Sequence, residues 1–151
     1  MVSFDEAVYF EREALSVAIF TVYFIWAWRA SQAGVFEMEN ASIIVGRAIL
    51  VLIFGGVLFT IVVQILTSIV VSIITREPKP SFVVDERDRM LELRAIRVSY
   101  SIIGMGFIAS MIALALGVNV LVVLQAIVLA FALGTLFESV LMLILYRWSA
   151  L

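Results

Sequence analysis

One carboxylate stands alone within a long apolar segment near the end of the chain. Glu138 lies in the sequence GTLFESVLMLILYRW, nine residues before Arg147, which is about 13 Å along an α-helix. If this segment spans a bilayer, the carboxylate lies near the middle of the hydrocarbon layer. A charged carboxylate that faces lipid is costly, so we expect Glu138 to face other helices, a second subunit or a water-filled cavity, or to stay protonated.

Two interpretations of Glu138 follow from that position. The functional interpretation is a site where protons or cations bind within the membrane. The structural interpretation is a carboxylate that is hydrogen-bonded across helices and only fixes their packing. Both interpretations stay open, because the sequence has no second acid at the same depth.

A row of small and polar residues marks one face of the most apolar segment. Its members recur every four residues and are Gly56, Thr60, Gln64, Ser68 and Ser72. Such a row either lines a polar path or permits close packing between helices in lipid. Gln64 lies at a depth similar to that of Glu138, so we expect Gln64, with Thr60 nearby, to be its polar partner under either interpretation.

Small residues also recur every four positions in the last two apolar segments. They are Ala109, Ala113 and Gly117, followed by Ala126, Ala130 and Gly134. This spacing predicts close contact between helices. It also places Glu138, four residues after Gly134, on a packed face.

Three further carboxylates fall on one helical face outside the apolar segments. Asp85, Asp88 and Glu92 are spaced i, i+3 and i+7. Carboxylate oxygens bind hard cations, so this face is a candidate for a weak cation site or for a partner. The alternative is the solvated start of a helix. Basic residues that would then contact lipid headgroups are Arg87, Arg94 and Arg97.

The composition defines the setting of these residues. The chain has 151 residues, 64% of them hydrophobic and 15% charged, whereas soluble domains are about 45–50% apolar. This is the composition of an integral membrane protein. Cysteine and histidine are both absent, which removes disulfides, cysteine nucleophiles and the usual general base. We expect no enzyme activity, no cofactor and no dedicated metal centre.

Four segments are long and apolar enough to span a bilayer. They comprise residues 14–33, 41–75, 98–116 and 120–146. Residues 1–13 are predicted to form an amphipathic interfacial helix, and residues 76–97 a cytoplasmic loop and helix start. We therefore expect a single all-α membrane domain, with four transmembrane helices as two antiparallel hairpins and the third helix extended into the cytoplasm.

The distribution of basic residues predicts the orientation. Six of the ten lie in residues 76–97, whereas the turn at 117–119 has none. The positive-inside rule places residues 76–97 and both termini in the cytoplasm. The predicted location is the inner cell membrane, crossed several times.

The charged stretch also carries a resemblance to known sequences. The run D-E-R-D at residues 85–88, followed by Glu92, Ala95, Arg97, Ser99 and Tyr100, resembles the D-E-R-[D/E] juxtamembrane motif of small prokaryotic membrane proteins of unknown function. The resemblance covers about sixteen residues, and the usual lysine before the alanine is Arg94 here. Some such proteins are similar to ones encoded beside helix-turn-helix regulators, so the resemblance implies a regulatory role as one alternative.

Two functional hypotheses from different classes follow. The first is a small oligomeric channel- or transporter-like protein that handles protons or cations at Glu138. The alternative is a non-transporting accessory or regulatory subunit that binds a partner through its cytoplasmic loop. The expected partners are the lipid bilayer, further copies of the chain and, under the second hypothesis, a membrane or cytoplasmic protein, with no nucleic acid.

Overall fold

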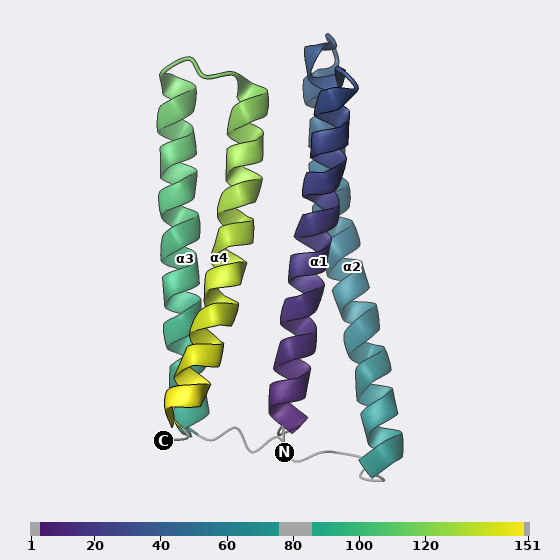
Figure 1. The fold of residues 1–151 in the computed structure, drawn as a ribbon, viewed down its shortest axis with the longest axis vertical. Coiled ribbons are helices and arrows are strands. Elements are labelled where there is room, and N and C mark those ends of the chain that lie inside the picture. Colours follow the sequence, from purple (N-terminus) through teal and green to yellow (C-terminus); the bar gives the residue numbers. More distant parts are fainter. Residues whose placement is uncertain (1–3, 76–85, 150–151) are drawn as a thin grey trace.

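The computed structural model describes the backbone of residues 4–75 and 86–149, and the side chains of residues 14–70, 73, 89–90, 93–142 and 144. Its elements are α1 (Phe4–Gln32), the short 3-10 helix η1 (Val35–Glu37), α2 (Ala41–Thr75), α3 (Glu86–Ala115) and α4 (Val120–Ser149) (Figure 1). All four α-helices of the described residues are long and apolar enough to cross a membrane. The predicted all-α architecture with four such helices is confirmed.

The helix bounds differ from the predicted ones at the start of the chain. α1 is continuous from Phe4 to Gln32, so residues 4–13 form its first part rather than a separate helix along the membrane surface. An unbroken helix keeps its backbone hydrogen bonds internal from the water phase into lipid, which favours continuity here. The predicted loop at 76–85, with both prolines, lies outside the described residues.

The helices contact one another very unequally. α3 and α4 lie side by side and share the most extensive contact of the described residues, while α1 meets α2 and α4 over shorter stretches (Figure 1). α2 leaves α1 toward the Thr75 end. The start of α1, the end of α2, the start of α3 and the end of α4 all lie at the same end of the molecule.

The turn between α3 and α4 is short because its backbone groups are satisfied locally. Gly117 has φ of 85°, which only glycine adopts without strain. The amides of Gly117 and Val118 donate to the carbonyls of Leu114 and Ala113, both at 3.0 Å, which is a Schellman motif. The side-chain oxygen of Asn119 then caps α4 by accepting a 2.8 Å bond from the amide two residues on.

The core lies where α1, α2 and α4 meet. Tyr23, Ala27 and Val128 form a buried cluster, and half-buried aromatic residues pack against it. Val45 of α2 is fully buried. By contrast, the most apolar 18-residue stretch of α2 contains no buried residue. Most of α2 therefore faces the surroundings of the isolated chain.

Small residues set the distance between α3 and α4. Ala130 and Gly134 are buried, and a methyl group on Gly106 would overlap the Cβ of Ala130. The predicted close packing is confirmed at these positions. Ala109 and Ala126 are instead exposed and border a groove of about 310 Å³, so the prediction of close contact was wrong there.

Substitution of Gly106 tests this contact. We expect Gly106→Ala to destabilise the protein by about 1–3 kcal/mol, because the new methyl group must displace α3 from α4. Gly104→Ala is the matched control, since nothing lies within 4 Å of a methyl group at Gly104. Unfolding in mixed micelles measures both free energies. Equal stability of the two variants would contradict the close approach.

Candidate functional site

The register of α3 against α4 determines which residues of α3 lie level with Glu138. A methyl group on Gly134 would lie 3.3 Å from the carbonyl oxygen of Ser99 and 2.5 Å from Cγ1 of Ile103. Gly134 therefore faces the stretch between Ser99 and Ile103. Because the helices run in opposite directions, four residues further along α4 correspond to about four residues back along α3. Glu138 thus lies level with Arg97.

The depth of Glu138 in the bilayer stays a prediction. α4 continues for eleven residues beyond Glu138, to Ser149, about 16 Å along the helix. What the structure adds is the level of Glu138 relative to Arg97, because the register of the neighbouring helix is not visible in the sequence.

Glu138 has the partly enclosed environment that both the functional and the structural interpretation require. Its side chain is half-buried and engaged in a polar interaction. Ser99, on the face of α3 that packs against α4, is only 3% exposed, whereas Arg97 is exposed. The described residues therefore place the carboxylate beside the buried contact of α3 with α4, level with an exposed cation.

The row of small and polar residues on α2 begins in a helix contact and then leaves it. Gly56 lies against Ile19 of α1, and the half-buried Thr60 donates a 2.9 Å hydrogen bond to the carbonyl of Gly56. Gln64 is exposed, and α2 leaves α1 toward its Thr75 end (Figure 1). Gln64 is not enclosed with Glu138 within one chain, and their pairing stays a prediction.

The predicted acidic face and headgroup contacts are only partly described. Four of these predicted site residues have side chains outside the described part of the chain, namely Asp85, Arg87, Asp88 and Glu92. Arg94 and Arg97 are exposed on α3, and their contact with lipid headgroups stays a prediction. Among the described residues there is no group of three histidine, cysteine, aspartate or glutamate side chains that could hold a metal ion.

One polar pair was missed by reasoning from sequence. The hydroxyl of Tyr23, a residue 5% exposed, lies beside the side-chain amide of Gln125 across the α1–α4 contact. Neither the hydroxyl nor the amide completes a hydrogen bond within the described structure. The sequence does contain one indication of this pair, the single amide in the run VLVVLQAIVL, because an amide in lipid forms hydrogen bonds with neighbouring helices.

Comparisons with protein-family models, curated proteins and solved structures find no match to this chain. Function is therefore inferred from its side chains and their packing alone.

The stability of a Tyr23→Phe variant tests whether the Tyr23 hydroxyl lacks a hydrogen-bond partner. We expect Tyr23→Phe to leave stability unchanged or to raise it by up to about 1 kcal/mol, because it removes a buried polar atom without a partner and keeps the ring. Tyr100→Phe, at a residue that is 70% exposed, is the control. Unfolding in mixed micelles measures both. A loss above about 1 kcal/mol for Tyr23→Phe would show a hydrogen bond to the hydroxyl.

Proposed function

We propose that this is a small oligomeric, channel- or transporter-like membrane protein that handles protons or cations at Glu138. The supporting observation is a half-buried, engaged carboxylate within an apolar helix. Ionisable groups inside spans are costly and usually mark ion or proton pathways. Its position level with Arg97 favours access from the charged end of the bundle.

The proposal includes a topology. α1 with α2 and α3 with α4 form two antiparallel hairpins, and the first turns of α3 extend into the cytoplasm. Exposed Arg89, Arg94 and Arg97 on α3 support this orientation, because basic residues favour the cytoplasmic side. Both termini are then cytoplasmic, and the protein resides in the inner cell membrane.

Flux through reconstituted protein tests the role of Glu138. We expect Glu138→Gln to abolish proton or cation flux in proteoliposomes, because the neutral amide can neither release a proton nor balance a cation's charge. The matched control is Glu37→Gln, the same change at an exposed residue of the turn. Flux is followed with a pH-sensitive dye across a pH gradient and with several cations. Wild-type rates in Glu138→Gln would remove Glu138 from the pathway.

The accessory hypothesis has one supporting observation of its own. Met90 and Leu93 are 59% and 54% exposed on the charged first part of α3, outside the predicted span 98–116. Apolar side chains exposed beside Arg89 and Arg94 form a surface that a membrane or cytoplasmic protein would cover. Absence of flux under every condition would favour this second function.

Self-association is proposed from the exposure of Gln64. The amide is exposed on the longest apolar helix, between the charges of Arg47 and Arg76. An amide that faces hydrocarbon lacks hydrogen-bond partners, and a second polar helix face supplies them. We infer that a second copy of the chain covers this face of α2.

An exchange of Gln64 tests that contact. We expect Gln64→Leu to weaken self-association in vesicles by about 0.6–2 kcal/mol, the range for amide hydrogen bonds between transmembrane helices. Gln32→Leu is the control, because Gln32 is exposed at the end of α1. Energy transfer between labelled copies reports association at several protein-to-lipid ratios. Equal association of both variants would place the interface elsewhere.

A further inference from the structure

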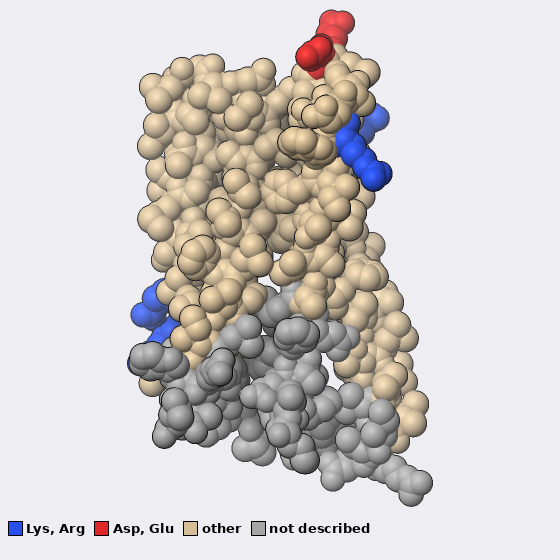
Figure 2. Space-filling model, in the orientation of Figure 1, with Lys and Arg blue, Asp and Glu red and all other residues tan. Residues whose placement is uncertain are grey.

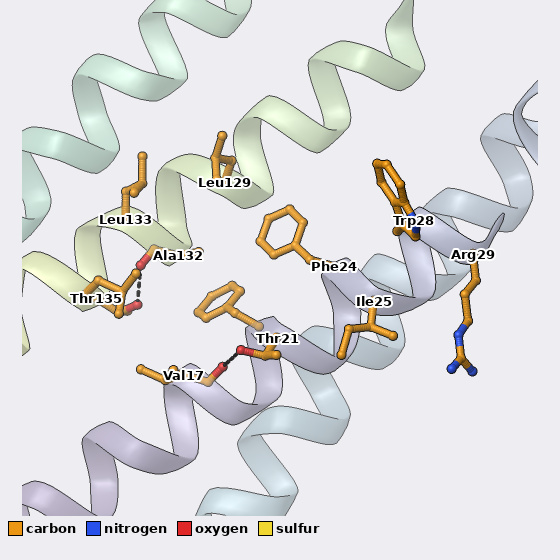
Figure 3. Close-up of a pocket in the computed structure, with 12 residues that line it drawn as sticks. Val17, Thr21, Phe24, Ile25, Trp28, Arg29, Leu129, Ala132, Leu133 and Thr135 are labelled. Carbon is orange, nitrogen blue, oxygen red and sulfur yellow. Dashed lines mark hydrogen bonds between the residues drawn. The ribbon is translucent and has the colours of Figure 1, made fainter. Parts of the chain in front are cut away.

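A groove of about 490 Å³ runs between α1 and α4 on the surface of the bundle (Figure 3). Its α1 side includes Val17, Thr21 and Phe24, and its α4 side includes Leu129 and Leu136. Its volume falls within the range of about 300–1,000 Å³ typical of small-molecule sites. The groove is separate from Glu138, which does not line it.

The lining selects an apolar occupant. Two hydroxyl groups lie in the groove, and both already donate a hydrogen bond to a backbone carbonyl of their own helix. Thr21 donates a 2.7 Å bond to the carbonyl of Val17, and Thr135 donates a 2.9 Å bond to the carbonyl of Ala132 (Figure 3). No hydroxyl proton of the lining remains for a polar ligand, so the groove suits a hydrocarbon chain.

The length of the groove matches one leaflet of a bilayer. Its α1 wall extends from Val17 to Arg29, twelve residues apart, or about 18 Å along the helix. Half of a hydrocarbon core of about 30 Å is about 15 Å. An acyl chain of the leaflet that contains the α1–α2 turn therefore fits along the groove.

Arg29 stands at one end of the groove, and its guanidinium group points away from α4 (Figure 3). Arg29 borders it at the α1–α2 turn and is exposed, and no ion pair involves it within the described part of the chain. The acidic side chains lie at the tip of the turn, apart from the basic ones below them (Figure 2). Trp28 beside it is 69% exposed, as is usual for tryptophan at the headgroup level.

We propose that this groove binds an anionic phospholipid, with one acyl chain between α1 and α4 and the headgroup phosphate at Arg29. A guanidinium group binds phosphate oxygens through two parallel hydrogen bonds. The apolar lining and the exposed guanidinium group at its border thus match the two ends of one lipid molecule. This ligand site is independent of ion handling at Glu138.

Tryptophan quenching tests the headgroup preference. Trp26→Phe with Trp148→Phe leaves Trp28 as the only tryptophan, and it lines the groove. In vesicles with matched bromine content, we expect brominated phosphatidylglycerol to bind beside Trp28 about fivefold more strongly than brominated phosphatidylcholine, the factor for one arginine near an anionic headgroup. Arg29→Gln should remove this preference.

Arg47→Gln provides the matched control, because Arg47 is also exposed but belongs to α2 and does not line the groove. It should retain the fivefold preference. Equal quenching by both lipids in the protein with Arg29 intact would overturn the proposal, as would equal loss of the preference in both arginine variants.

A second pair of variants tests the groove itself. Thr21→Phe places a large side chain in it, whereas Val22→Phe adds a ring at a neighbouring residue that is 68% exposed and outside the lining. Native mass spectrometry should show less retained phosphatidylglycerol for Thr21→Phe only. The proposal would be overturned if Thr21→Phe left lipid retention unchanged. It would also be overturned if Thr21→Phe changed the subunit number without loss of lipid, because a second copy would then occupy the groove.

Discussion

The close approach of α3 and α4 determines where Glu138 lies along the bundle. Gly106 lies so near Ala130 that no larger residue fits without displacing a helix, and this contact fixes the register of the two helices. The register in turn places Glu138 level with Arg97 and near the buried Ser99. A cation at the same level as a carboxylate favours its charged form, which lowers the cost of ionisation within an apolar helix.

Lipid divides the polar side chains into two groups. Short hydroxyl residues satisfy themselves by donating to their own helix, as Thr60, Ser110 and Ser139 do to the carbonyl four residues earlier. Longer amide and phenol groups project too far from the backbone for such a bond. Gln64 and Tyr23 therefore depend on neighbours. Among the described residues the Tyr23 hydroxyl has no hydrogen-bond partner, and Gln64 is exposed.

Sequence reasoning succeeded where a single helix determines the outcome. The four apolar helices and the turn at Gly117 follow from local composition, the need for φ above zero and backbone satisfaction in lipid. It failed where two helices must be placed together. The level of Glu138 relative to Arg97 depends on the contact of Gly134 with α3, and the approach of Tyr23 to Gln125 depends on how α1 meets α4.

The contact between α1 and α4 joins the closely packed pair α3 and α4 to α1 and α2. α3 and α4 hold each other through an extensive packed face, whereas α1 meets α4 over a shorter one. That shorter contact contains Tyr23 and Gln125, whose polar atoms have no hydrogen-bond partner among the described residues. It also borders the groove that begins at Val17. Regions with fewer apolar contacts open at lower free energy. A lipid chain in the groove would extend this seam with dispersion contacts that the helices alone do not provide, so the bilayer itself would help to hold the halves together.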